Sequence, residues 1–454
     1  MKEKKGQTKE LSRFLTSMKF SDFTPKTVET AKMCVEDFIG VAIAGSVKPE
    51  SKIWDEYYAS KPTASQATVF RQGFDRVSVE QAAALNAVAG HVMDMDDVHN
   101  ASISHLGVIT IPTAFALGQQ LHKSGRDVIE AVTAGYEAGA RIGETINPSS
   151  YKYWHTTGVI GTFTSAVTAG KLLGLNEEQM LNSMGSAGTQ SGGLWEFLET
   201  GAMSKVLHTA HANLCGIRSA QLAKLGFTGA PAILEGDRGF VRALASEFDL
   251  DCLTKGLGKG LRIDDNSFKP YACCRHTHSA NYCVEKILAV HCLNPEDIVS
   301  ITDDTYSTAV QTTNNPYPEN SYAAKFSVQY CIAAAIILKD LSDKAFKPEN
   351  VANPKIRSLM EKIKVQTSPE LDAAFKADPN QWSHRLTIQM KNGNTIVEQV
   401  DYPIGDFKNP FDLAMADRKF LNLAADALGD ERAEKLLEDI HHLESTEDIN
   451  TLFQ

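Results

Sequence analysis

The sequence of 454 residues has no uninterrupted apolar run long enough to cross a membrane. A spanning helix needs about 20 mostly apolar residues, and no window here reaches about 18. The N-terminal MKEKKGQTKE is charged, and the apolar core of a signal peptide does not follow it. Basic residues are in deficit, with 45 Lys and Arg against 56 Asp and Glu and a formal net charge of −11. We therefore expect a cytoplasmic protein whose partners are neither membranes nor nucleic acids.

Recognisable metal and nucleotide motifs are also lacking. The eight cysteines show no paired zinc spacing. Cys273 and Cys274 precede His276 and His278, but adjacent thiols with alternating imidazoles cannot readily surround one tetrahedral ion. The glycine-rich segment 185–193 has neither the GxGxxG spacing of a dinucleotide site nor the GK(S/T) ending of a phosphate-binding loop. We predict reduced thiols and no metal.

The first 266 residues have the apolar periodicity of successive helices. Hydrophobic residues make up 43% and charged residues 22% of the chain, which is typical of a globular protein, and the length favours two domains. Apolar side chains recur at helical spacing and stop signals separate the segments. The expected helices span residues 24–44, 79–91, 111–121, 128–142, 162–173, 178–184 and 204–225.

The pattern changes near residue 267. Residues 298–305 alternate as a strand does, and the segments 385–390 and 395–400 flank Asn392-Gly393, a hairpin-turn pair. Helices are expected at about 278–291 and 323–340, and again at 411–428 and from residue 430. We predict a mainly α fold with a large all-helical domain (1–266), an inserted smaller α+β domain (267–403) and a C-terminal return to the helical domain (404–454).

Ionisable residues gather in four clusters, of which the first runs from His91 through Asp94, Asp96 and Asp97 to His105. Three carboxylates within four positions are costly to bury without partners. Three interpretations are open: a metal site, an acid–base site, or a helix end with two solvated carboxylates and a capping histidine. The cluster has no Glu-x-x-His or calcium-loop pattern.

The other three clusters also combine polar residues with apolar surroundings. His155 follows two aromatic residues and is either a hydrogen-bonded core histidine or a titrating group. The glycines of 185–193 permit tight turns whose backbone N–H groups can approach an anion. Lys205, which follows, is otherwise an ordinary surface lysine. The segment 269–278 crowds two cations, two thiols and two histidines at the expected domain junction.

Taken in order, these clusters resemble the signatures of the MmgE/PrpD family. The matching segments are 94–97 with His105, 154–155, 202–208, 269–274, 325–330, 402–405 with 409–410, and 417–420. The similarity runs over nearly the whole chain. It implies a large helical domain with a smaller α+β lid domain, a homodimer, and no metal or organic cofactor. Members of the family include 2-methylcitrate dehydratases, cis-aconitate decarboxylases and iminodisuccinate epimerases.

The resemblance also implies which residues form the site. Family catalytic positions fall on Asp94, His105, His155, Lys205, Lys269 and on a later histidine, either His276 or His278. The substrate-binding residues that we expect are Arg275, Tyr330 and Gly192. One departure is Val98, which stands where animal decarboxylases of the family carry a hydroxyl residue.

These residue types suit chemistry at a carbon beside a carboxylate. Lys205, Lys269 and Arg275 would hold carboxylates and neutralise developing charge, and histidines would transfer protons. Asp94 would orient a histidine or keep it charged. We expect a lyase that acts on a small polycarboxylate, such as a dehydratase or a decarboxylase. The alternatives are an epimerase of an iminodisuccinate-like dicarboxylate and a non-catalytic helical binding protein, whose clusters would lie on separate surfaces.

Overall fold

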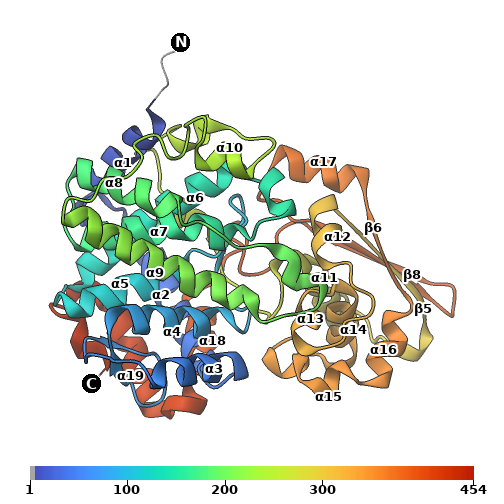
Figure 1. The fold of residues 1–454 in the computed structure, drawn as a ribbon. Helices are drawn as coiled ribbons and strands as arrows, with labels where there is room; N and C mark the ends of the chain where they lie inside the picture. The colour runs from blue at the N-terminus through green and yellow to red at the C-terminus, as the bar shows by residue number, and fades with distance from the viewer. Residues whose placement is uncertain (1–5, 454) are drawn as a thin grey trace.

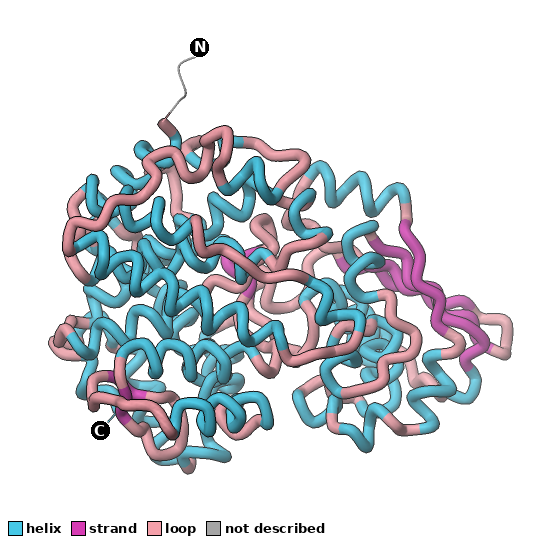
Figure 2. Tube along the Cα trace, viewed as in Figure 1, coloured by secondary structure: helices cyan, strands magenta, loops and turns pink. Residues whose placement is uncertain are grey.

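The structure is a computed structural model that describes residues 6–453. Helices make up most of the chain, and strands are confined to one four-stranded sheet and two small pairs in this range (Figure 2). The prediction of a mainly α fold is confirmed. No helix within residues 6–453 combines the length and apolarity that a membrane crossing requires.

Nine helices between residues 6 and 224 pack into one body around a continuous apolar core (Figure 1). They are α1 (Gln7–Ser17), α2 (Pro25–Gly45), α3 (Pro49–Ala59), α4 (Val79–His91), α5 (Gly107–Gln120), α6 (Gly125–Ile146), α7 (Thr156–Leu172), α8 (Glu177–Gly188) and α9 (Ser204–Lys224). Helix α7 contacts α6, α8 and α9, and small residues allow the close approach. A Cβ on Gly161 would lie 2.8 Å from the Cβ of Ala212, so the α7–α9 contact requires glycine.

The second half of the chain builds the sheet. Its strands are β5 (Ile298–Thr305), β6 (Ile363–Thr367), β7 (His384–Met390) and β8 (Thr395–Val400), in the order β6-β5-β7-β8. Only β5 and β6 are parallel. Alternate residues of β5 and β7 are buried in a core with α11 (His278–Val290) and α14 (Val328–Leu338). The connecting helices are α12 (Ser307–Thr313), α13 (Ser321–Lys325), α15 (Pro348–Val351), α16 (Pro354–Met360) and α17 (Pro369–Ala377), whereas the short helix α10 (Phe240–Leu244) packs against α6 in the helical body.

The chain ends on two helices, α18 (Leu413–Leu428) and α19 (Asp430–His441), which pack against α2. Figure 1 shows these red helices beside the blue N-terminal ones. Phe420 of α18 lies against Gly40 of α2, where an added Cβ would be 3.0 Å from the ring. The two ends of the sequence therefore share one core.

Most expected elements are present, with small shifts at their ends. Helix α4 and strands β5 and β8 have the predicted bounds. The expected helix 323–340 is instead two helices, because the Ser327 hydroxyl accepts a hydrogen bond from Tyr330 N (3.0 Å) and starts α14 anew. The sequence analysis missed the pair β3 (Val98–His99) and β4 (Asn266–Ser267), which joins the first ionisable cluster to the fourth.

Candidate active site

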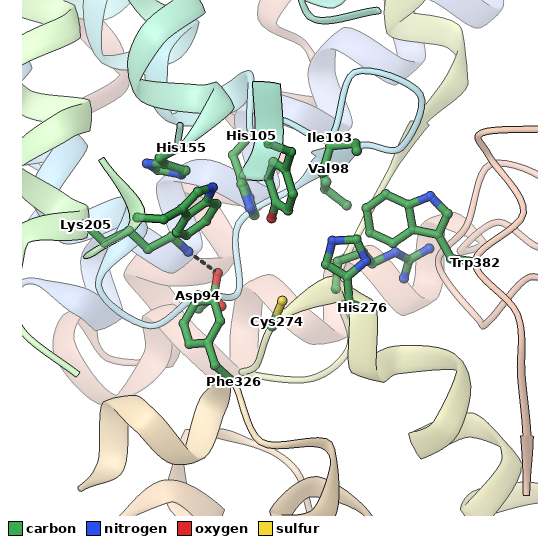
Figure 3. A pocket seen from close by; sticks show the side chains of 13 residues that line it. Asp94, Val98, Ile103, His105, His155, Lys205, Cys274, His276, Phe326 and Trp382 are labelled. Atoms are coloured by element: carbon green, nitrogen blue, oxygen red, sulfur yellow. Dashed lines mark hydrogen bonds and ion pairs between the residues drawn. The ribbon is translucent and has the colours of Figure 1, made fainter. Parts of the chain in front are cut away.

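A small pocket with a cavity volume of about 20 Å³ lies where the four ionisable clusters meet (Figure 3). The loop after α4, the starts of α7 and α9, and the segment after β4 supply its polar side chains. The lining residues are Asp94, Val98, Ile103, His105, Tyr151, His155, Trp195, Lys205, Cys274, Arg275, His276, Phe326 and Trp382. Residues from both sides of position 267 therefore form one site.

Asp94 holds two buried lysines at the pocket. Its Oδ1 accepts hydrogen bonds from Lys205 Nζ (2.7 Å) and Lys269 Nζ (3.0 Å), and its carbonyl oxygen accepts a second bond from Lys269 (3.1 Å). Burial alone would raise the pKa of Asp94, but the two ammonium groups outweigh it and hold that pKa well below its usual range. Burial opposes a charged Lys269, yet Asp94 and Asp96 raise its pKa. The trio therefore carries one net positive charge.

Four histidines form a second group around Asp96. Oδ2 of Asp96 lies 2.8 Å from His91 Nδ1 and 3.2 Å from His105 Nδ1. The His91 ring stacks on His155 with ring centres 5.6 Å apart. His155 Nδ1 is in turn 3.1 Å from His208 Nδ1. The Asp96 carboxylate thus contacts the imidazoles of His91 and His105, and the His91 ring in turn contacts His155.

The pocket histidines His105, His155 and His276, together with His91, titrate below their normal range. Burial, reinforced by His208 and Lys205, lowers the pKa of His155 well below its usual value. Burial also lowers the pKa of His91 and His276 to about 3 each and lowers that of His105, although Asp96 opposes the shift at His91 and His105. All four imidazoles are therefore neutral near pH 7.

Several buried polar atoms at the pocket have no hydrogen-bond partner among the residues that the structure describes. They are Asp94 Oδ2, His105 Nδ1, His155 Nε2, Trp195 Nε1 and His276 Nε2. Buried polar groups are normally satisfied, so unpaired atoms gathered in one pocket indicate a ligand site. Figure 3 shows His155 and Lys205 on one side of the pocket and His276 with Trp382 on the other.

The chain matches two family models in sequence order. The MmgE/PrpD N-terminal domain matches residues 9–253, and the MmgE/PrpD C-terminal domain matches residues 271–443. The chain belongs to the MmgE/PrpD family. Cis-aconitate decarboxylase of Aspergillus terreus is 26% identical to it, with 99% of this chain and 96% of that protein covered. Cis-aconitate decarboxylase of Homo sapiens is 25% identical, with 99% and 94% covered. That of Mus musculus is 26% identical, with 99% and 93% covered.

The structure brings together most of the residues expected from the MmgE/PrpD resemblance. Asp94, His105, His155, Lys205, Arg275 and His276 line the pocket. Lys269 does not line it but reaches it through Asp94. Of the two candidate histidines after Lys269, the structure places His276 at the pocket. His276 stacks on Trp382 with ring centres 4.2 Å apart, and its Nδ1 pairs with the Tyr306 hydroxyl.

Besides Lys269, three expected residues lie outside the pocket lining. His278 Nε2 is 3.1 Å from the Cys273 carbonyl oxygen, and the ring packs against Tyr271. The Tyr330 hydroxyl donates to the Ala345 carbonyl (2.6 Å), which turns it into the core behind α14. Gly192 lies in the loop before Trp195 and is not among the lining residues. None of these three residues lines the pocket, although His278 Nδ1 lies 3.4 Å from Nη1 of the lining residue Arg275.

The first cluster also differs from expectation. Asp94 binds lysines rather than a histidine, and Asp96 orients the histidines instead. The interpretation with solvated Asp96 and Asp97 is wrong, because both are fully buried. Asp97 accepts hydrogen bonds from Gly107 N (3.1 Å) and the Tyr136 hydroxyl (2.7 Å). The signal for His91 was its place five residues before Asp96, at the end of an alanine-rich helix.

Two groups within the described residues have the spacing to hold a metal ion: His91, Asp96 and His105 at the pocket, and Glu36, Asp417 and His441 elsewhere. In the first group His91 Nδ1 is hydrogen-bonded to Asp96 (2.8 Å), whereas His105 Nδ1 lies 3.2 Å from Asp96 Oδ2 without a hydrogen bond. Four aromatic residues also line the pocket, and the sequence analysis did not identify them as site residues. They are Tyr151, Trp195, Phe326 and Trp382.

Proposed function

We propose that this MmgE/PrpD protein is a cofactor-independent lyase that removes CO₂ or water from a small di- or tricarboxylate by histidine and lysine acid–base chemistry. The unpaired polar atoms of Asp94, His155 and His276, which face one pocket beside Lys205, carry the proposal. The similarity to proteins named cis-aconitate decarboxylase supports it. The non-catalytic alternative expects the clusters on separate surfaces, which this convergence disfavours.

Substrate binding follows from charge. The Asp94, Lys205 and Lys269 trio has one net positive charge in a buried site, where a carboxylate gains more from it than in water. Arg275 also lines the pocket, and its guanidinium is held 2.9 Å from Asp406. Carboxylates of one substrate would then bind at each end and align the bond between them.

Proton transfer is assigned to the neutral histidines. A bound anion stabilises an imidazolium, so substrate binding raises the pKa of His155 and His276 and recruits a proton. In decarboxylation of an unsaturated substrate, the bond between carbon and the leaving carboxylate breaks and CO₂ departs. The electron pair shifts the double bond, and the far alkene carbon takes the proton from His155 Nε2. Lys205 neutralises the charge that develops on the neighbouring carboxylate.

Asp96 and His91 would act through His105 rather than on the substrate. Asp96 pairs with both imidazoles, which fixes the His105 ring and stabilises its protonated form. The pocket histidines could also catalyse dehydration. One histidine removes the proton beside a carboxylate, and a second protonates the departing hydroxyl so that water leaves.

An epimerase is the second candidate, and one observation favours it. His155 and His276 face the pocket from opposite walls, each with an unpaired Nε2 (Figure 3). Inversion at a carbon needs removal of a proton from one face and delivery to the other. Two opposed imidazoles provide both groups.

We further propose that residues 267–403 form a lid over the helical body and that the protein is a homodimer. Cys274, His276, Phe326 and Trp382 from this range line the pocket. Closure over substrate predicts slower hydrogen exchange around Phe326 and Trp382 when cis-aconitate is present. Light scattering at the mass of one chain would contradict the dimer.

The experiment that tests the proposal is a substrate panel followed by proton NMR. The purified protein is incubated with citrate, 2-methylcitrate, cis-aconitate and iminodisuccinate, with and without EDTA. The lyase proposal expects loss of CO₂ or water from one of them, unchanged by the chelator. Inversion of iminodisuccinate would favour the epimerase. Turnover that EDTA abolishes and a metal restores would refute cofactor independence.

A further inference from the structure

A second cluster of ionisable residues lies where α2, α18 and α19 meet. It consists of Glu36, Asp417 and His441, which we call the Glu36 cluster. None of the three lines the pocket. One residue comes from each helix, so residues far apart in the sequence converge on one point.

The distances within the Glu36 cluster suit a single ion. His441 Nε2 is 3.1 Å from Asp417 Oδ1 and 3.5 Å from Glu36 Oε2, and the three ligand atoms lie within 4.8 Å of one another. A tetrahedral Zn²⁺ with bonds of about 2.1 Å separates its ligand atoms by about 3.4 Å. Small side-chain movements would therefore complete the coordination.

Glu36 supplies the second observation. Its side chain is 2% exposed, and Oε1 has no hydrogen-bond partner within residues 6–453. Asp37 and Asp417 add negative charge beside it, and Lys419 is the cation that partly offsets them. Burial, then Asp417 and Asp37, raise the pKa of Glu36 to about 8. A buried carboxylate oxygen without a hydrogen bond is costly, and a cation between the carboxylates removes that cost.

We propose that the Glu36 cluster is a structural divalent-metal site that takes a transition ion of the Zn²⁺ type. One imidazole and two carboxylates are a common donor set for such ions, with water in the remaining position. Asp417 and His441 are each 29% exposed, which gives the ion a path from solvent.

The site joins the two ends of the chain. An ion there fastens α18 and α19 to α2, which share the core of the helical body. Two residues after Asp417, Lys419 donates to the Met95 carbonyl (2.8 Å), next to Asp94 in the pocket loop. The ion would thus stabilise the fold near the pocket without contact with substrate.

Isothermal titration with Zn²⁺ on the full chain, after dialysis against EDTA, tests the proposal. Wild type should show a site that Glu36→Gln and His441→Gln each weaken by roughly 100-fold or more, because loss of a ligand exceeds the usual outer-shell effect. Zn²⁺ should raise the Tm of wild type and leave both variants unchanged. His441 is partly exposed, so the His441→Gln variant folds even if the Glu36→Gln variant, which changes a buried side chain, does not.

The matched controls are His442→Gln and Glu438→Gln, which change residues of the same chain end outside the Glu36 cluster. Both should bind Zn²⁺ as wild type does. Binding at the exposed Cys292 or at the pocket histidines would survive in the Glu36 cluster variants. If the wild-type isotherm and Tm shift are the same in His441→Gln, or if wild type binds no Zn²⁺, the proposal is overturned. No assay of turnover is involved, so the outcome is independent of the lyase proposal.

Discussion

At the scale of residues, Asp94 has a backbone conformation that matches its role. Its φ is 54°, in the left-handed region, where Asn and Asp are the best-tolerated residues after glycine. That turn directs the carboxylate to Lys205 and Lys269 rather than toward His91. The two lysines depend on it, because a buried ammonium without its partner is strongly destabilising.

Asp94→Asn and Asp94→Ala should therefore both lower the free energy of unfolding, and Asp94→Ala should lower it more. Both remove the charge that pairs two lysines, with a cost of roughly 3–5 kcal/mol, typical of a broken buried pair. Alanine adds about 1 kcal/mol because it adopts the left-handed conformation less readily. Urea melts should rank wild type above Asp94→Asn above Asp94→Ala. Equal stability of all three would mean that the lysines are not held by this carboxylate.

His155→Ala should lower kcat by roughly 10²–10⁴, the usual contribution of an acid–base group. The fold should survive, because the side chain supplies little apolar burial. The control is His442→Ala, a histidine outside the pocket lining. Circular dichroism melts and single-substrate kinetics separate the effects. A large drop in Tm with unchanged activity per folded molecule would return His155 to a packing role.

At the scale of elements, the start of α5 fixes the first ionisable cluster. Gly107 N donates to Asp97 Oδ1, and a Cβ on Gly107 would lie 2.2 Å from that oxygen and 2.9 Å from the Tyr136 hydroxyl. His105 precedes this contact by two residues, so the beginning of α5 sets the position of its ring.

Gly107→Ala should lower both stability and activity, because the new methyl group displaces the Asp97 carboxylate. Overpacking of this kind costs about 1–3 kcal/mol. Gly192→Ala is the matched control, since nothing lies within 4 Å of its Cβ position. Its Tm and its kcat/KM should match those of wild type. A Gly107→Ala protein with wild-type Tm would show that this contact does not hold the loop.

Features that depend on a local sequence pattern could be predicted, whereas features that depend on contacts between distant residues could not. Helix α4 and strand β5 have local periodicity, so their bounds were predictable. The β3–β4 pair has two residues per strand and joins His99 to Asn266, a contact that no local pattern carries. His155 and Lys205 were predictable from motifs, whereas the pairing of Asp96 with His91 depends on the turn between them. Tyr330 lies in a matching motif, but its hydroxyl faces the core.

At the scale of the whole molecule, burial of neutral histidines ties stability to pH. Seven have lowered pKa values: His91, His99, His105, His155, His208, His276 and His278. Burial is the largest cause in each case. Seven carboxyl groups act in the opposite direction: Asp97 and Glu36 have pKa values raised to about 7 and about 8, and the pKa values of Asp37, Glu144, Asp264, Asp265 and Glu285 are raised less.

Stability should therefore fall as pH drops below about 6.5. The unfolded chain binds protons on its histidines near that pH, and the folded chain does not until about pH 3 for His91, His99 and His276. Each such histidine contributes a slope of about 1.4 kcal/mol per pH unit in that window. Urea melts at pH 7.5, 6.5, 5.5 and 5.0 give the slope. A free energy of unfolding that stays level or rises on acidification would contradict the buried neutral histidines.

The central claim is that the pocket transfers a proton to carbon through His155. The direct test is to incubate the protein with cis-aconitate in D₂O and follow the product by proton NMR. The account predicts loss of CO₂ and one solvent deuteron at the former alkene carbon, at a rate that His155→Ala lowers by roughly 10²–10⁴ and His442→Ala leaves unchanged. A product without solvent deuterium, or one formed equally fast by His155→Ala, would contradict it.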